Sequence, residues 1–322
     1  MQKDDVYDVI IVGAAAAGLT AAIYTARQGM STLVIGKDVG GQALLTNDIQ
    51  NYPGYDNIDG FTLTSKFEKQ AKSFNAEIIY DEVQKIHGED GNFKVETPSK
   101  QFRSQTIILA FGKTPRDLGV PGEDRFKGRG LSYCATCDGP LYRGKTVAIV
   151  GSAEYAVDAA VMLSDIAEKV YQISNRDRLV GDGDLLTNLE SRKNVVFVSN
   201  SNVSEIMGDQ TVESIKVLNV KSGSEEEYNV DGIFVELGYV AMTDFVKDLV
   251  NLNERKEVIV DKECRTSRKG VFAAGDVTDM PFKQLVISAG QGSTAALSAY
   301  NYLQKLKGKS IIRGDWKSKK SK

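Results

Sequence analysis

Two cysteines separated by two residues carry the clearest chemical signal in this 322-residue chain. This spacing lets the sulfurs of Cys134 and Cys137 close a small disulfide ring, or present a thiolate beside a thiol. A zinc site would need two more ligands, and the sequence offers one histidine, His87, and one other cysteine, Cys264. The pair therefore predicts a dithiol that cycles between oxidised and reduced forms, and zinc is the weaker alternative.

An acidic residue, Asp138, directly follows the second cysteine. A carboxyl group at that position could hold and deliver the proton that each thiolate gains or loses, so we predict an acid and base role. The structural alternative is an N-cap for the next segment. Cys264 lies in a strand-like stretch, 258–264, and is interpreted as a packing residue. His87 is interpreted as a loop residue.

The elements that could position this chemistry begin with an apolar, β-branched run over residues 7–12, which predicts a buried parallel strand. The run leads into a loop from Gly13 to Gly18, a helix over 19–28 and a second strand over 32–35. A dinucleotide diphosphate can bind at such a loop, because free backbone N–H groups point outward at the start of a helix. The sequence thus predicts a βαβ dinucleotide-binding unit.

The loop departs from the usual GxGxxG fingerprint at one position. Ala15 stands where the middle glycine normally allows the pyrophosphate to approach closely. Gly36 and Lys37 stand where an acidic residue, about 20 residues after the loop, usually binds a ribose. Ribose recognition must therefore come from elsewhere in the chain.

A second unit of the same kind follows later in the sequence. A strand, a loop, a helix and a strand are predicted at 146–150, 151–156, 157–166 and 169–173. A third block, 270–276, is a strand ending in Gly-Asp and is followed by a helix-like segment over 285–306. Turn-rich segments at 114–119 and 240–243 are natural places for the chain to cross between domains.

These elements predict an α/β fold with two Rossmann-like dinucleotide-binding domains, the second inserted into the first. Residues 1–115 and 244–322 would form the first, discontinuous domain. Residues 116–243 would form the second domain and carry the cysteine pair. The crossing points near residues 116 and 243 would be the hinges if the two domains rotate relative to each other.

Composition and charge narrow the class of protein. Hydrophobic residues make up 42% of the chain and charged residues 26%, which is typical of a folded globular protein. No apolar run reaches the roughly 18 residues of a membrane span, and the N-terminus lacks a secretory signal, so we expect no membrane segment and a cytoplasmic location. A net charge of -3 gives no basic field for nucleic acid, and three cysteines are too few for a secreted disulfide scaffold.

Five motifs, in this order along the chain, resemble the low-molecular-weight thioredoxin reductase family of flavoprotein disulfide reductases. They occupy residues 40–42, 51–54, 118–123, 132–139 and 271–278. The resemblance extends over about residues 6–307, and five ordered motifs are far more specific than any one of them. It implies that the first domain binds FAD and that the second is a pyridine-nucleotide-type domain.

The resemblance also implies roles for particular residues. Asp276 would bind the ribityl side of the flavin, and Lys283 with Gln284 stands where the family has Arg-Gln near the isoalloxazine. The residues expected to line the FAD site are Gly13, Ala15, Ala16, Ala17, Gly18, Gly41, Gln42, Asn51, Gly112, Gly275, Asp276, Lys283 and Gln284. In the family Cys137 would face the flavin and Cys134 would attack a protein disulfide, with Asp138 as acid and base; the sequence by itself does not order the two sulfurs.

The second nucleotide site departs further from the family. The residues expected there are Gly151, Ala153, Arg176 and Arg178. Tyr155 occupies a position that is normally small, and Val180 stands at a position that is arginine in NADPH-using members. The 2′-phosphate of NADPH needs several charge-assisted hydrogen bonds, and this chain offers one matched arginine, Arg176, with a displaced neighbour, Arg178. Three kinds of electron donor therefore stay open: NADPH, NADH, or another such as ferredoxin, a deazaflavin or a second flavin.

The expected function is transfer of two electrons from a reductant through FAD to the Cys134 and Cys137 pair, and then to thioredoxin or a similar small disulfide protein. The family resemblance also implies a homodimer. One rival is a flavin-linked ferredoxin or pyridine-nucleotide reductase, which would not use the cysteines. The other is a redox sensor that uses flavin and dithiol to report a state.

Overall fold

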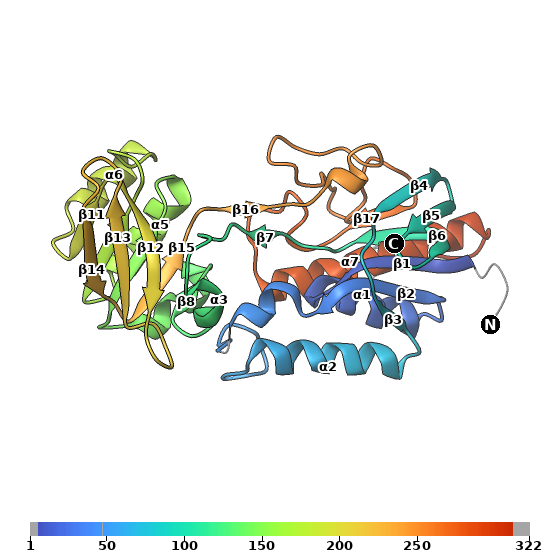
Figure 1. Ribbon diagram of the computed structural model, residues 1–322. Coiled ribbons are helices and arrows are strands. Elements are labelled where there is room, and N and C mark those ends of the chain that lie inside the picture. The colour runs from blue at the N-terminus through green and yellow to red at the C-terminus, as the bar shows by residue number, and fades with distance from the viewer. Residues whose placement is uncertain (1–5, 47, 312–322) are drawn as a thin grey trace, which may run out of the picture. The chain divides into compact units, whose positions relative to one another are not determined.

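The computed structural model describes residues 6–46 and 48–311, which divide into two compact units (Figure 1). The first unit contains the residues up to Ala43, then Thr62–Lys113, and the chain from Ala241 onward. The second contains Leu44–Phe61 and Thr114–Val240, so it is inserted into the first. Across the described residues, no helix is both long enough and apolar enough to cross a membrane.

The first unit is built on a mixed sheet in which a parallel part dominates. Its strands are β1 Val6–Ala14, β2 Thr32–Val39, β3 Glu77–Tyr80, β4 Lys85–Glu89, β5 Asn92–Glu96, β6 Gln101–Leu109 and β17 Val271–Ala273. Neighbours follow the order β3-β2-β1-β6-β5-β4, and β17 also pairs with β6. The pairs among β3, β2, β1 and β6 are parallel, whereas β4, β5 and β6 pair antiparallel.

Strand β6 has two different neighbours along one edge. Its first half pairs with β5, from Gln101 to Ser104, and its second half pairs with β17, from Ile107 to Leu109. The predicted third block therefore lies in the same sheet as the first βαβ unit, although it comes from a distant part of the sequence. This pairing brings the Gly-Asp that follows β17 to the carboxyl edge of the parallel strands.

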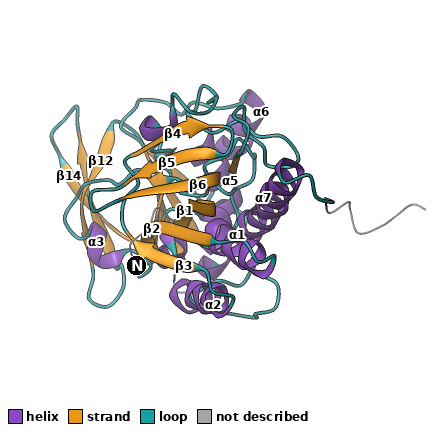
Figure 2. Ribbon diagram, turned by 90° about the vertical axis from the view of Figure 1, so that its right-hand side faces the viewer, coloured by secondary structure: helices purple, strands orange, loops and turns teal. Residues whose placement is uncertain are grey.

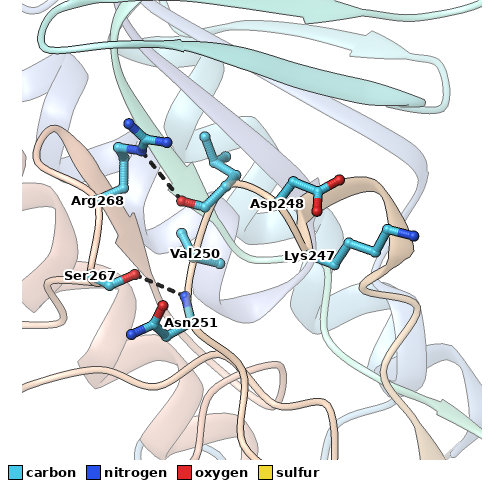
Figure 3. Close-up of a pocket in the computed structure, with 7 residues that line it drawn as sticks. Lys247, Asp248, Val250, Asn251, Ser267 and Arg268 are labelled. Carbon is cyan, nitrogen blue, oxygen red and sulfur yellow. Dashed lines mark hydrogen bonds between the residues drawn. The ribbon is translucent and has the colours of Figure 1, made fainter.

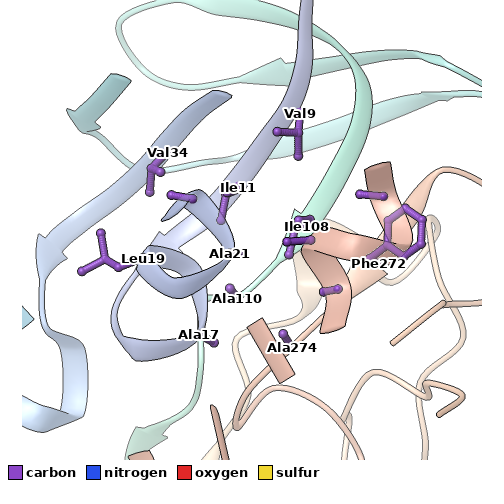
Figure 4. Close-up of a cluster of buried hydrophobic side chains, with 14 of the residues drawn as sticks. Val9, Ile11, Ala17, Leu19, Ala21, Val34, Ile108, Ala110, Phe272 and Ala274 are labelled. Carbon is purple, nitrogen blue, oxygen red and sulfur yellow. The ribbon is translucent and has the colours of Figure 1, made fainter. Parts of the chain in front are cut away.

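Helices cover one face of this sheet, as Figure 2 shows for α1, α2 and α7. They span Ala16–Arg27, Gly60–Ser73 and Leu285–Leu306, and the short 3₁₀ segments η1 and η3 span Gly41–Leu45 and Asp244–Val246. Successive strand residues point to opposite faces, so Val9 and Ile11 pack with α1 and α7 while Ile10 and Val12 pack on the other side. Figure 4 shows the helix-facing cluster, in which Ala17 and Ala21 of α1 permit close packing.

The second unit contains a fully parallel sheet in the order β11-β10-β9-β15-β8. Its strands are β8 Leu131–Ser132, β9 Thr146–Val150, β10 Lys169–Ile173, β11 Val195–Val198 and β15 Gly232–Val235. An antiparallel sheet joins β12 Ser201–Met207, β13 Ser214–Asn219 and β14 Glu225–Asn229, and β7 Thr114–Pro115 pairs with β16 Tyr239–Val240. Its helices are α3 Glu123–Phe126, α4 Ala135–Asp138, η2 Gly139–Tyr142, α5 Glu154–Ser164 and α6 Gly183–Glu190.

The predicted fold class is confirmed, since each unit places a strand, a turn, a helix and a parallel strand in succession and the second unit interrupts the first. Two local predictions were wrong. Residues 258–264 form turns with an isolated bridge at Val258 and are not a strand; Cys264 has a φ of 59°. His87 lies within β4 rather than in a loop, because its neighbours pair with β5.

Candidate active site

Cys134 and Cys137 form a disulfide, with their Cα atoms 5.3 Å apart. Strand β8 ends at Ser132, and Cys134 then caps the single turn of α4 in an extended conformation. The N–H of Cys137 donates to Sγ of Cys134 over 3.3 Å and to its carbonyl oxygen over 3.1 Å. The turn therefore holds the pair in a geometry that closes readily and keeps an amide donor on the first sulfur.

Asp138 is the last residue of α4, and its partly buried carboxyl group accepts two hydrogen bonds from hydroxyl groups. Its Oδ2 accepts a hydrogen bond of 2.6 Å from the Ser132 hydroxyl, and its Oδ1 accepts one of 3.2 Å from the Thr46 hydroxyl. Burial raises the pKa of Asp138, the charge of Asp48 raises it further, and the two hydroxyl bonds oppose the shift. The N-cap alternative is not realised, because the side chain of Asp138 makes no cap bond to η2.

A second carboxyl group, which no sequence motif had indicated, reaches the same turn. Glu236 directly follows β15, and its Oε1 accepts the Ala135 N–H over 3.1 Å. Burial raises the pKa of Glu236 to about 7. The available signal was an acidic residue directly after a buried apolar strand, at the edge where parallel strands present functional groups.

Residues of the motif over 118–123 bond Tyr133, which directly precedes Cys134. The hydroxyl of Tyr133 donates to Asp117 over 2.6 Å and to Glu123 over 2.9 Å. Glu123 also accepts the backbone N–H groups of Leu118 and Gly119, each over 2.7 Å. Because Tyr133 precedes Cys134, these bonds fix the entry of the chain into the active turn.

In the first unit, β1 runs into the predicted phosphate loop and α1 begins at Ala16, with Ala15 as its N-cap residue. A Cβ atom added at Gly41 would lie 3.3 Å from the Cβ of Ala15. Gly275 has a φ of 81°, and a Cβ atom there would lie 2.9 Å from the Cβ of Ala17. The structure therefore brings three sequence-predicted segments to one helix N-terminus, and small residues leave the backbone of that loop approachable.

Asp276 is held by two donors in this same region. Its Oδ1 accepts the Ser288 hydroxyl over 3.1 Å, and its Oδ2 accepts the Gln42 amide over 3.2 Å. Gln42 also donates to the carbonyl oxygen of Lys113 over 2.9 Å. Burial raises the pKa of Asp276, and the hydrogen bond from Ser288, the charge of Lys283 and the other nearby donors and cations counter that shift.

A buried ion cluster adjoins Asp276. Glu257, which is 6% exposed, bonds Lys113 closely and lies 3.4 Å from Nζ of Lys283. Lys283 also donates to the carbonyl oxygen of Thr278 over 2.6 Å. Burial lowers the pKa of Lys283, as does the charge of Lys113. The predicted residue Lys283 is thus fixed in position, next to a second lysine that no sequence motif had indicated.

Not all predicted FAD residues gather at this loop. Gly112 and Gln284 belong to the first unit. Gly112 precedes Lys113 and has a φ of 65°, and Gln284 is the N-cap residue of α7. Asn51 lies in the segment Leu44–Phe61, which packs with the second unit.

The second predicted nucleotide loop has different surroundings. Helix α5 begins with Glu154, and the adjacent Tyr155 is 57% exposed. The carbonyl oxygen of Ser152 accepts the N–H of Val180 over 2.8 Å, so the segment after β10 folds back onto the loop. The side chains of Arg176 and Arg178 on that segment are exposed.

Two surface hollows in the first unit contain none of the predicted site residues. One, of about 400 Å³, is lined by Lys247, Asp248, Leu249, Val250, Asn251, Ser267 and Arg268 (Figure 3). The neighbouring one includes His87 and Phe245. Within the described residues, no group of three or more potential metal ligands comes together.

The paired Rossmann-like units and the acid-flanked disulfide define a class of redox enzyme, and the comparison with known families agrees. Residues 7–296 match the family described as pyridine nucleotide-disulphide oxidoreductase. The chain is 39% identical over 302 residues to a thioredoxin reductase of Treponema pallidum (strain Nichols), covering 93% of this chain and 98% of that relative. It is 35% identical over 308 residues to the thioredoxin reductase of Bacillus subtilis (strain 168), covering 95% and 98%.

A solved structure is similar over the same extent. The crystal structure of thioredoxin reductase from Streptococcus pyogenes MGAS5005 matches with a TM-score of 0.91 and 37% identity, covering 94% of this chain and all of that one. The chain belongs to the thioredoxin reductase family, as its ordered motifs predicted. It is accordingly an oxidoreductase whose working group is the Cys134 and Cys137 pair.

Proposed function

We propose that the protein is an FAD-dependent thioredoxin-disulfide reductase, in which two electrons pass from a reductant through FAD to the Cys134 and Cys137 disulfide and on to thioredoxin or a similar protein disulfide. The observation that carries this proposal is the disulfide itself, closed on a one-turn helix with Asp138 held beside it by Ser132 and Thr46. Such a pair, next to a carboxyl group of raised pKa, can take up electrons and protons together.

The first domain, 1–115 with 244–322, is proposed to bind FAD. Bound there, the flavin would supply the two-electron step that side chains cannot perform. The small residues of the loop would admit its diphosphate, and the half-buried acceptor Asp276 would bind its ribityl hydroxyls. Lys283 would present a positive charge to the ring system, with its position set by Glu257 and Thr278.

Asp138 is proposed to move the protons of the dithiol. Opening the disulfide with two electrons yields two thiolates, and each becomes a thiol only when it gains a proton. The raised pKa of Asp138 lets its carboxyl carry a proton at a pH where an exposed aspartate has lost it. Ser132 and Thr46 orient both oxygens, so the carboxyl stays close to the turn in either state.

The second domain, 116–243, carries the dithiol and is proposed to bind the electron donor. Two candidates for that donor are considered. Arg176 and Arg178 are exposed and could bind the 2′-phosphate of NADPH, which is the favoured donor. The acidic Glu154 at the start of α5 and the large Tyr155 favour a second candidate, in which the enzyme receives electrons from ferredoxin or another non-nicotinamide donor.

We further propose that the enzyme works as a homodimer in the cytoplasm, where thiols are kept reduced. Thioredoxin is named by the relatives of this chain, and the same class of partner is proposed here. A small redox protein of this kind would be attacked by whichever sulfur is exposed when the domains rotate about residues near 116 and 243.

The test is anaerobic absorbance spectroscopy of the purified protein mixed in turn with NADPH, NADH and reduced ferredoxin. Bleaching of the flavin band by NADPH, followed by reduction of thioredoxin, is the expected result. Bleaching by ferredoxin alone would establish the second candidate for the donor. A protein without flavin absorbance would contradict the proposal as a whole.

Single cysteine variants order the sulfurs and separate the rival classes. With Cys134→Ser we expect Cys137 to remain as a thiolate beside the flavin and to give a long-wavelength charge-transfer band, and Cys137→Ser should lack that band. Both variants should lose thioredoxin reduction. A chain that kept full turnover with a small-molecule oxidant, and no thioredoxin activity in any form, would instead be a flavin-linked reductase or a sensor.

A further inference from the structure

Glu236 occupies a position beside the dithiol that follows directly from the register of the sheet. Strands β8 and β15 are parallel, with Phe234 opposite Ser132. Cys134 lies two residues beyond Ser132, and Glu236 lies two residues beyond Phe234, so both emerge at the same edge of the sheet. The carboxyl group is therefore placed against the active turn by the fold and not by a flexible loop.

The hydrogen bond from Ala135 fixes this carboxyl at the start of α4. Ala135 follows Cys134 and is the first residue of α4, so its N–H, 3.1 Å from Oε1 of Glu236, is one of the helix-start amides that have no partner within the helix. Such donors stabilise a thiolate when they are free to face it. Glu236 occupies one of them and adds a negative charge nearby.

No ion pair neutralises Glu236 within residues 6–46 and 48–311, and its Oε1 bonds a neutral amide. The titratable groups on the surrounding elements are mostly acidic or thiol groups. They are Cys134, the N-cap residue of α4, with Cys137 and Asp138 on α4, Tyr142 on η2, and Glu154, Tyr155 and Asp158 on α5. One cationic residue, Arg116, bonds the same segment through its backbone N–H, 2.9 Å from the carbonyl oxygen of Gly238. A thiolate formed at this turn would thus meet the negative charge of Glu236 once that carboxyl group ionises, above about pH 7.

We propose that Glu236 is a positioning residue that makes the dithiol a stronger reductant, because its carboxylate, held on the Ala135 N–H, disfavours a thiolate at Cys134. The inference rests on the proposed function and specifies how the dithiol is tuned within it. Reduction of the Cys134–Cys137 bond consumes two electrons from the reduced flavin and two protons, and oxidation by a target disulfide returns both. Environments that stabilise the thiolate make a pair oxidising, and Glu236 acts in the opposite sense.

The test compares Glu236→Gln with Glu236→Ala in the flavin-loaded protein. Glutamine keeps an oxygen that accepts the Ala135 N–H but removes the charge, and alanine removes both. Iodoacetamide alkylation of Cys134, followed by peptide mass spectrometry across pH, gives the thiol pKa, and equilibration with dithiothreitol gives the redox equilibrium constant. Glu190→Gln, an exposed acid on α6 of the same unit, is the matched control.

At pH 9.5, where a thiol of ordinary pKa is mostly ionised, we expect Glu236→Gln to raise the thiolate fraction of Cys134 and to shift the dithiol equilibrium toward the reduced form up to about tenfold, or about 30 mV for this two-electron couple. At pH 8, where Cys134 is still mostly a thiol, the shift should be about twofold or less. The alanine variant should do the same. Below about pH 6 the wild type and the glutamine variant should converge, because the carboxyl is then protonated. The wild-type protein should itself show a Cys134 pKa above the ordinary thiol value of about 8.5.

An unchanged equilibrium constant in a folded, flavin-loaded Glu236→Gln protein overturns the proposal. So does a shift seen with alanine but not glutamine, because the hydrogen bond alone would then explain it. If neither variant folds, a wild-type Cys134 pKa at or below the ordinary value overturns it. Failure of the proposed function is a separate result, since it would show as absent flavin or absent thioredoxin reduction in the wild-type protein.

Discussion

The two βαβ loops of this chain share a backbone plan but differ in what surrounds them. The first, from Gly13 to Gly18, is joined by Gly275 close to Ala17 and by Asp276, which two donors hold in place. The second, from Gly151 to Ala156, contains the acidic helix start Glu154 and the exposed Tyr155, and the predicted Arg176 and Arg178 have exposed side chains. Neither loop keeps the middle glycine.

The two loops therefore differ mainly in the residues that distant parts of the chain bring to them. In the first unit, a strand from the end of the sequence, β17, delivers a Gly-Asp to the loop, and a buried ion cluster adjoins it. In the second unit, the corresponding edge delivers Glu236, which turns to the dithiol. In the first unit the groups at this edge surround the loop, and in the second the carboxyl group at the corresponding edge bonds the turn of the cysteine pair.

The largest expected effect comes from Asp276→Ala. Removing an acceptor that would bind cofactor hydroxyls should weaken FAD affinity about tenfold to a hundredfold, since a hydrogen bond to a charged group contributes about 1.5–3 kcal/mol. Fluorescence titration of the flavin-free protein with FAD measures this. Glu154→Ala, at the second loop, should leave FAD affinity unchanged, and equal losses in both variants would remove the distinction between the regions.

A matched pair of loop substitutions gives the next effect. Ala15→Val adds two methyl groups to the Cβ atom of Ala15. That atom faces Gly41, because a Cβ atom added at Gly41 would lie only 3.3 Å from it. We expect about a tenfold loss of FAD affinity, corresponding to about 1.4 kcal/mol. Ala153→Val should leave the flavin-to-protein absorbance ratio unchanged. Loss of flavin from the Ala153 variant would show that the second loop also contacts it.

The double substitution Arg176→Ala with Arg178→Ala sharpens the description of the second region. If these exposed arginines bind the 2′-phosphate, KM for NADPH should rise a few-fold to about tenfold, because exposed ion pairs each contribute about 0.2–1 kcal/mol. KM for NADH should not change. Steady-state kinetics with both nucleotides decide the matter, and identical kinetics for the variant and the wild type would leave the arginines without a part in donor binding.

A separate prediction concerns the stability of the fold at different pH values. Burial raises the pKa of Glu236 to about 7, so the folded chain holds this proton more tightly than the unfolded chain does. Its stabilising contribution is complete below the ordinary glutamate pKa of about 4.3 and is lost as pH rises through about 7. Glu236→Gln should therefore be more stable than the wild type at pH 8, by on the order of 1–3 kcal/mol, and not at pH 4.5. Thermal unfolding at the two pH values measures this, and parallel profiles would contradict it.

Much of the fold could be predicted because its signals are local. The apolar runs of β1 and β9, each leading into a glycine and a helix, mark the two units, and Cys134 with Cys137 identifies the redox turn from spacing alone. His87 was misassigned because β4 takes its identity from pairing with β5, which a single sequence does not display. Residues 258–264 have strand composition, but Val258 bridges to Thr278 and the chain then turns.

The parts of the site that escaped prediction depend on contacts between distant residues. Lys113 is positioned by its ion pair with Glu257, and Glu236 is positioned by the register of β15 with β8. Thr46 bonds Asp138 from the segment Leu44–Phe61, which the sequence analysis had assigned to the first domain and which the structure groups with the second unit. None of these residues carries a motif, and each becomes visible only when the strands are placed side by side.

The pairing of β17 with β6 has a consequence for how the protein is made. The chain leaves the ribosome from its N-terminus, so β1, α1 and β6 emerge long before β17 and α7. All strands of the parallel sheet in the inserted unit have been synthesised by Val235. The sheet of the first unit is completed only later, when β17 pairs with β6 and α7 packs against α1. During synthesis the nascent first unit therefore exposes an apolar helix face, and we expect it to be the part that engages chaperones.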